Sequence, residues 1–115
     1  MNIEAVVEGL MGFAEDDRVP LWMICCDVED ELGAAEPERN LEVTLVVVRE
    51  LLKRGLIAGD SPVHGIDFNA WPIQDAEVIL DFIRREWSRR GGFPEWGDGP
   101  WFALLRFCRT SHAAA

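Results

Sequence analysis

Apolar side chains recur three or four positions apart in the first two segments of the chain, which predicts two amphipathic helices. The first stripe consists of Ile3, Val6, Val7, Leu10 and Ala14, and Asn2 stands where an N-cap is expected. After a polar turn at 15–18, Pro20 fits the first turn of a second helix, because that position needs no backbone N–H. The predicted buried stripe of this helix consists of Leu21, Ile24, Cys25, Val28 and Leu32.

A third and longer helix is predicted from Pro37 to Arg54, with Gly55 at its C-terminal end. Apolar residues cover most of its circumference, which predicts that it is the central element of the core. They are Leu41, Val43, Leu45, Val46, Val47, Val48, Leu51 and Leu52. Short strands are expected at 56–58 and 66–68, and the turn-forming residues 59–65 between them predict a small hairpin.

One further helix is predicted in the last third of the chain, roughly from Gln74 to Arg90. Acidic Asp75 and Glu77 at its start and basic Arg89 and Arg90 at its end complement the helix dipole. A turn-rich loop at 91–100 follows. The apolar segment 101–108 fits either a helix or a strand. A helix is favoured because one helical face would hold Trp101, Leu104, Leu105 and Cys108.

Three helices, a short hairpin and a further helix are the element order of a winged-helix-like α+β domain that is mostly helical. We therefore expect a single domain over residues 1–110 and a frayed tail over 111–115. No apolar run approaches the roughly 18–20 residues of a membrane span. The start of the chain lacks the basic segment of a secretory signal, and three cysteines do not suit a disulfide framework. These features indicate a cytoplasmic protein that does not contact a membrane.

The chain has a formal net charge of −10, and residues 1–36 carry nearly all of it. That segment holds ten acidic residues and a single basic one, Arg18. A field of this sign repels nucleic-acid phosphates, so we expect no binding to nucleic acid. It attracts a basic partner. The alternative is that an acidic surface only keeps a small protein in solution.

Motifs with known chemistry are weak in this sequence. Ser61, His64 and Asp67 lie within seven residues, but they lack a nucleophile elbow and are ordinary in a hairpin loop. Cys25 and Cys26 are adjacent, and no cysteine or histidine has metal-ligand spacing. The glycine-rich stretches lack the lysine or the preceding strand that a phosphate loop requires. We therefore expect no catalytic residue, no metal and no cofactor, and a protein that is not an enzyme.

Five tryptophans are many for a chain of 115 residues. Trp87 falls on a predicted helix stripe and is expected in the core. Trp71, Trp96 and Trp101 lie near predicted turns, where both packing and partner binding remain open.

The run from Val48 to Asp60, VRELLKRGLIAGD, resembles the passage from helix to wing in winged-helix proteins. It is followed by Phe68-x-x-Trp71-Pro72, by Glu86-Trp87 and by Pro94-x-x-Gly97-Asp98-x-x-Trp101-Phe102. With these motifs, residues 45–102 are similar to small, uncharacterised, winged-helix-like bacterial proteins. Some of those proteins are thought to be immunity proteins of polymorphic or contact-dependent toxin systems. The resemblance implies the fold and toxin neutralisation, and it transfers no catalytic residue.

These observations predict a non-enzymatic cytosolic protein-binding module, an immunity protein that neutralises a basic toxin domain. The alternative is a winged-helix-type transcriptional regulator or a ligand-responsive adaptor. Charge complementarity would speed association and select the partner. The identity of the partner and the oligomeric state stay open. The residues expected to contact the partner are Glu15, Asp16, Asp17, Asp27, Asp30 and Glu31.

Overall fold

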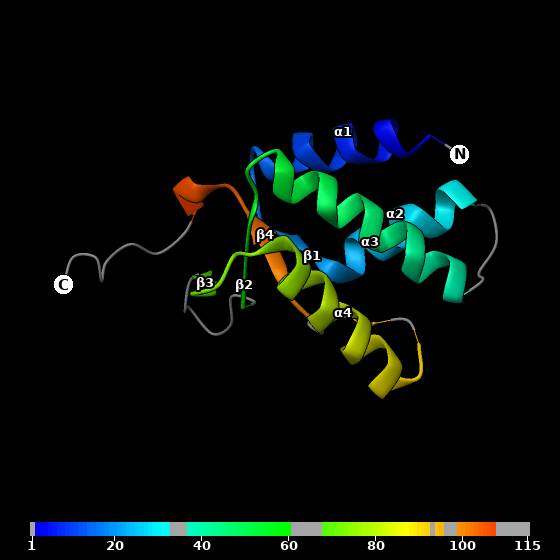
Figure 1. The fold of residues 1–115 in the computed structure, drawn as a ribbon. Coiled ribbons are helices and arrows are strands. Elements are labelled where there is room, and N and C mark those ends of the chain that lie inside the picture. The colour runs from blue at the N-terminus through cyan, green and yellow to red at the C-terminus, as the bar shows by residue number, and fades with distance from the viewer. Residues whose placement is uncertain (1, 33–36, 61–67, 93, 96–98, 108–115) are drawn as a thin grey trace.

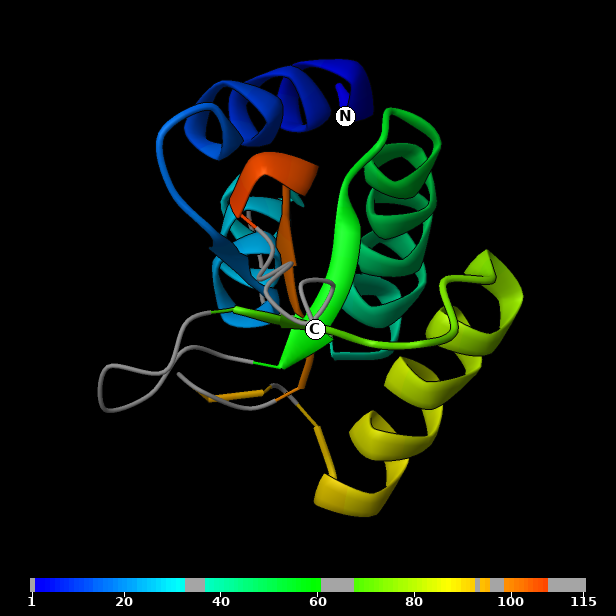
Figure 2. The ribbon, with the colours of Figure 1, turned by 90° about the vertical axis from the view of Figure 1, so that its left-hand side faces the viewer.

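The computed structural model describes residues 2–32, 37–60, 68–92, 94–95 and 99–107, so the expected tail at 111–115 lies outside the described residues. The elements, in chain order, are α1 (Ile3–Ala14), β1 (Val19–Pro20), α2 (Leu21–Leu32), α3 (Pro37–Lys53), β2 (Ile57–Asp60), β3 (Asn69–Ala70), α4 (Ala76–Arg90), β4 (Trp101–Ala103) and the 3₁₀ helix η1 (Leu105–Phe107). Figures 1 and 2 show α1 and α4 at opposite sides of the molecule. Among the described helices, none has the length and apolar character needed to cross a bilayer.

The four short strands form one antiparallel sheet in the order β1-β4-β2-β3. Phe102 of β4 pairs with Val19 on one side and with Ala58 on the other, so β4 is a central strand. The predicted α+β, mostly helical class is confirmed, and β2 and β3 form the expected hairpin. The winged-helix likeness is not confirmed. It rested on the order of helices and hairpin, whereas the sheet also contains β4, which follows the fourth helix.

The helix expected at 101–108 is wrong. Residues 101–103 form β4 and residues 105–107 form η1, while Cys108 lies outside the described residues. Trp101, Phe102 and Ala103 are all buried, because β4 has a paired strand at each edge and is covered on both faces. A strand covered on both faces shows no alternation of polar and apolar residues, so its sequence also fits a helical face.

The hairpin strands are displaced from their expected positions. β2 continues to Asp60, and β3 is Asn69–Ala70, whereas residues 66 and 67 lie outside the described part of the chain. Gly59 allows this pairing, because a Cβ atom there would lie 2.5 Å from the carbonyl oxygen of Asn69 and 2.6 Å from the ring of Phe68. The close approach of two strands and an aromatic ring explains why a glycine stands inside a strand.

Two predicted helix starts are also displaced. Pro20 belongs to β1 at the edge of the sheet, where a missing N–H costs nothing, and α2 begins at Leu21. α4 begins at Ala76, and Gln74 precedes it. The side-chain amide of Gln74 accepts a hydrogen bond from the Ala58 N–H and donates one to the Ala58 carbonyl, each at 2.8 Å. This amide therefore continues the hydrogen bonding of the β2 edge beyond β3.

The predicted N-cap of α1 and the predicted glycine after α3 are confirmed. The side chain of Asn2 accepts a hydrogen bond from the Ala5 N–H at 3.0 Å and caps α1. Gly55 follows α3 with φ at +104°, in the left-handed region that favours glycine after a helix. The stripes predicted for α1 and α2 face the core, where the buried residues are Val7, Leu10, Ala14, Leu21, Ile24, Cys25 and Val28.

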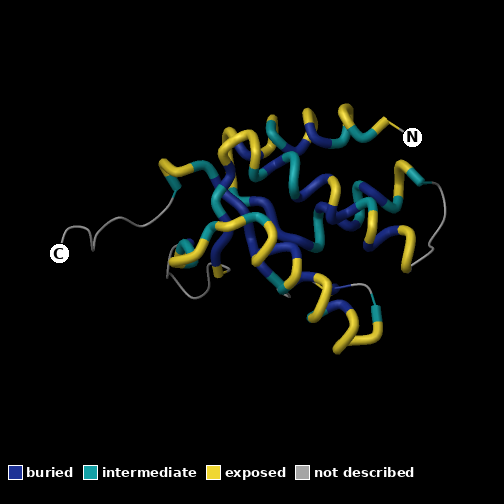
Figure 3. The backbone as a smooth tube through the Cα atoms, in the orientation of Figure 1, coloured by how far each residue is buried: buried dark blue, intermediate teal, exposed yellow. Residues whose placement is uncertain are grey.

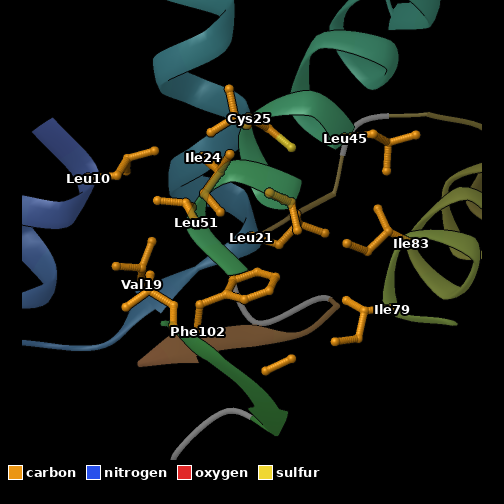
Figure 4. Packing of buried hydrophobic residues seen from close by; sticks show 14 of the residues in the cluster. Leu10, Val19, Leu21, Ile24, Cys25, Leu45, Leu51, Ile79, Ile83 and Phe102 are labelled. Atoms are coloured by element: carbon orange, nitrogen blue, oxygen red, sulfur yellow. The ribbon is translucent and has the colours of Figure 1, made fainter. Parts of the chain in front are cut away.

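As predicted, α3 is the central element, because it contacts α1, α2 and α4. Figure 4 shows Leu45 and Leu51 of α3 among core residues from α1, α2, α4 and β4, and Figure 3 shows the exposed residues on the outward faces of the helices. Two polar side chains, Asn40 and Thr44, are buried where α3 meets α2. The Thr44 hydroxyl donates to Asn40 Oδ1 at 3.0 Å, and Asn40 Nδ2 donates to the Cys25 carbonyl at 3.2 Å. These hydrogen bonds fix the register of α2 against α3.

Candidate protein-binding surface

The six predicted contact residues fall into two groups, one at each end of α1 (Figure 1). The turn group directly follows the last residue of α1. The α2 group lies beside the start of α1, where Glu31 Oε2 accepts a hydrogen bond from the Asn2 backbone N–H at 3.2 Å. A helix rises about 1.5 Å per residue, so roughly 18 Å separates the two ends of α1. The turn group is Glu15, Asp16 and Asp17, and the α2 group is Asp27, Asp30 and Glu31.

The turn group is largely offset by arginines. Arg106 in η1 donates to the Glu15 carbonyl oxygen, and its guanidinium lies 3.8 Å from the Glu15 carboxylate. Asp17 accepts a hydrogen bond from the Arg18 N–H at 2.7 Å, and the Arg18 guanidinium lies 3.8 Å from the same carboxylate. Both guanidinium groups also lie over the Phe107 ring, at 4.8 Å for Arg18 and 5.3 Å for Arg106. Two positive charges therefore stand beside these three carboxylates.

Two acidic residues of α1 are paired with a single arginine at the end of α3. Arg54 donates to Glu4 Oε2 at 2.7 Å and to Glu8 Oε2 at 2.8 Å. The hydrogen bond from Arg54 lowers the pKa of Glu8, and the bonds from both carboxylates raise the pKa of Arg54. The segment 1–36 therefore presents less negative charge than its composition indicates.

The α2 group has no such compensation. Neither its three carboxylates nor the neighbouring Glu29 pairs with a lysine or arginine among the described residues. Partial burial and then the charge of Asp30 raise the pKa of Asp27, which shows that the carboxylates repel one another. The three carboxylates of the α2 group thus form an electronegative surface beside α1, which we call the acidic face of α2: Asp27, Asp30 and Glu31. Glu29 lies about 160–200° around the helix from Glu31 and Asp27, so it belongs to another side of α2.

A groove of about 240 Å³ separates the acidic face of α2 from α1. The α2 group forms one wall, and small or apolar residues of α1 form the other, namely Ala5, Val6 and Gly9. A Cβ atom on Gly9 would meet nothing within 4 Å, so the groove is open there. The groove therefore offers an apolar surface next to carboxylates, which suits a long cationic side chain with an aliphatic stem.

The described residues hold no reaction centre of the kinds considered. Cys25 is buried, and desolvation raises its pKa to about 12. Desolvation and then Glu29 raise the pKa of Cys26. A nucleophilic cysteine needs a lowered pKa, so neither thiol is suited to that role. No group of three or more His, Cys, Asp or Glu is placed to hold a metal ion in the described ranges, and Ser61, His64 and Asp67 lie outside them.

The tryptophans at positions 71, 87 and 101 differ in burial. Trp87 of α4 and Trp101 of β4 are buried, so the core position expected for Trp87 is confirmed. Trp71 is half-buried, packs edge-to-face on Phe82 with ring centroids 5.1 Å apart, and donates to Asp60 Oδ1 at 2.9 Å. Trp96 lies outside the described residues. Trp101 is therefore a core residue, and Trp71 is only partly covered.

The groove between α3 and α4 was missed by the sequence reasoning. Two ion pairs cross it: Glu42 with Arg84, at 3.0 Å, and Arg49 with Glu77. Each helix carries a glutamate and, seven residues later, an arginine. Because the two helices run antiparallel, each glutamate faces the arginine of the other helix. That spacing was the available signal. One hollow of about 220 Å³ lies between the two ion pairs, and a second of about 650 Å³ lies beyond Glu42 and Arg84.

No protein-family model matches the chain, and comparisons with curated proteins and with solved structures give no match. The surfaces described above are therefore the observations on which a function must rest.

Proposed function

We propose that this chain is a cytosolic, non-enzymatic protein-binding module whose acidic face of α2 docks on a basic protein. By its resemblance to bacterial immunity proteins, the partner is a toxin domain with a basic active-site surface. The observation that carries this proposal is the absence of ion pairs at the acidic face of α2 within the described chain, while Glu4 and Glu8 are paired internally.

The contrast between paired and unpaired carboxylates supports binding over solubility alone. A carboxylate that already holds an arginine must exchange partners to bind a ligand, whereas an unpaired one gains a partner. Burial and then the charge of Asp30 raise the pKa of Asp27, and a cation from the partner would offset both effects. Complementary charge of this kind accelerates encounter and discriminates against acidic proteins and nucleic acids.

The test compares three forms of the protein as bait in extracts of the cells that produce it. Wild type and the variant Asp16→Asn/Asp17→Asn are expected to retain the same basic protein, whereas Asp30→Asn/Glu31→Gln is expected to lose it. Both variants remove two negative charges and keep hydrogen-bond acceptors, so they differ only in which group they neutralise. Glutamine at position 31 still accepts from the Asn2 N–H.

The purified complex then supplies a second measurement. Its affinity is expected to fall as salt rises from low to physiological concentration, mainly through slower association. Inhibition of the partner's activity in the complex is also expected. Equal retention of the partner by the two variants, or an affinity that does not respond to salt, would refute the proposal.

A further inference from the structure

The larger hollow between α3 and α4 combines an apolar floor with an acidic rim. Leu41 and Trp87, which are 8% and 7% exposed, form part of the floor. Glu38 and Glu42 stand at the rim, and Gly91 and Gly92 close the far end without side chains. The volume of about 650 Å³ is within the usual range of ligand sites, about 300–1,000 Å³.

Arg84 is the basic residue that lines this hollow, and it is bound to Glu42 at 3.0 Å. Glu38 is exposed and makes no ion pair with a basic residue of the described chain. The rim is therefore acidic in balance, and one of its carboxylates already binds a guanidinium group. The ion pair between Arg84 and Glu42 is thus an example, within the protein, of a guanidinium group bound at this rim.

We propose that this hollow, the α3–α4 pocket, receives a long cationic side chain, lysine or arginine, from a basic segment of the partner. The aliphatic stem lies over Leu41 and Trp87, and the charged head reaches Glu38 and Glu42. Arg84 competes with the incoming cation for Glu42. This inference rests on the proposed function and names a second contact point for the same partner.

The position of the pocket agrees with that role. The acidic face lies in the second half of α2, and the chain enters α3 only five residues after α2 ends, a distance of at most about 18 Å. Figure 1 shows the end of α2 and the start of α3 at the same end of the molecule. A basic protein docked on the acidic face of α2 can therefore also contact Glu38, because the start of α3 is close to the end of α2.

The test uses blocked pentapeptides, GGRGG and the neutral GGGGG, titrated at low salt into isotopically labelled full-length protein and followed by amide chemical shifts. GGRGG is expected to shift the Gly91 and Gly92 amides, and GGGGG is not. Glu38→Gln is expected to weaken binding about two- to fivefold, the range of one exposed charge pair. Arg84→Gln is expected to tighten it by a similar factor, because Glu42 becomes available.

Asp16→Asn is the control, since it removes one negative charge at a residue that does not line the pocket and should change the affinity less than about 1.5-fold. The unchanged dispersion of the remaining signals shows whether each variant is folded. Weaker or unchanged binding in Arg84→Gln, or shifts confined to Ala5, Val6 and Gly9, would overturn the pocket. The proposed function fails by a different result, retention of the natural partner by Asp30→Asn/Glu31→Gln.

Discussion

Gln74 holds the start of α4 on the sheet, and replacing it measures how much this contact contributes to the stability of the fold. Its side chain makes three hydrogen bonds of 2.8 Å: Oε1 accepts from the Ala58 N–H, and Nε2 donates to the carbonyl oxygens of Ala58 and Trp71. The Trp71 N–H also donates to the Ala58 carbonyl at 3.0 Å. One amide therefore hydrogen-bonds Ala58 of β2 at the point where β3 has ended.

Gln74→Ala removes all three bonds and leaves the Ala58 N–H without its partner. Each bond contributes about 0.5–1.5 kcal/mol, and Gln74 is only half-buried, so we expect a loss of about 1.5–3 kcal/mol in unfolding free energy. Gln74→Glu keeps the shape and the acceptor for Ala58. It replaces the donor with an oxygen facing two carbonyl oxygens, so at neutral pH its loss should be at least as large.

Acid should partly rescue Gln74→Glu, and this is the sharper test. The two carbonyls raise the folded-state pKa of the introduced carboxyl above its unfolded value, near 4.3. The protonated acid donates again, so the deficit relative to wild type shrinks as the pH falls through the folded-state pKa. Urea unfolding followed by circular dichroism, at neutral pH and at about pH 4, measures both deficits.

Asn69→Asp is the matched control for this series, because it makes the same change from amide to acid at an exposed position of β3. Its effect should stay within about 1 kcal/mol, because the new carboxylate lies opposite Asp60 in the register of β2 and β3. If Gln74→Glu is no less stable than Asn69→Asp at neutral pH, or if its deficit does not change with pH, the amide does not bridge the two carbonyls.

Three further predictions concern other contacts. Arg54→Gln should return the pKa of Glu8, measured by NMR titration, to the usual carboxyl range. In wild type the depressed pKa contributes stability that is lost as the pH falls through it, and the variant should lack this contribution. An unchanged Glu8 titration would contradict the pairing. Gly59→Ala should lower the unfolding free energy by about 1–3 kcal/mol or more, because the new Cβ would lie 2.5 Å from the Asn69 carbonyl oxygen. A neutral effect in urea unfolding would show that β3 does not lie against Gly59. Cys25 should resist thiol reagents in the folded protein at about pH 8, because burial raises its pKa to about 12, and it should react after unfolding. Mass spectrometry of the labelled peptide follows the reaction, and rapid labelling of the folded protein would contradict the buried position of Cys25.

The helices were predictable because their determinants are local. The positions of Val7, Leu10 and Ala14 along α1 are three and four residues apart, and the cap at Asn2 is a contact with Ala5. β4 was not predictable in the same way. Its strand character comes from pairing with Val19, more than eighty residues earlier in the chain, and with Ala58. No local pattern carries that information, and a fully buried apolar run fits helix and strand equally.

The ion pairs between distant residues also could not be predicted from local patterns. Arg54 lies 46 and 50 residues from the two glutamates that it binds, and Arg106 lies 91 residues from Glu15. Segment charge therefore overestimated the free acidity at the start of the chain. The seven-residue spacing of Glu42 with Arg49 and of Glu77 with Arg84 did carry the packing of α3 against α4, once both helices had been predicted.

Because several carboxylates pair with arginines inside the protein, the binding hypothesis now concerns fewer residues and is easier to refute. Ten acidic residues precede position 37, and four of them lie against arginines of the described chain: Glu4, Glu8, Glu15 and Asp17. Three of the others, Asp27, Asp30 and Glu31, form the acidic face of α2 on one side of a single helix. A surface selected only for solubility has no reason to pair carboxylates in one place and concentrate unpaired ones in another. Because repulsion within that face costs stability, the free protein should gain stability when the face is neutralised, and the partner should lose affinity in the same variant.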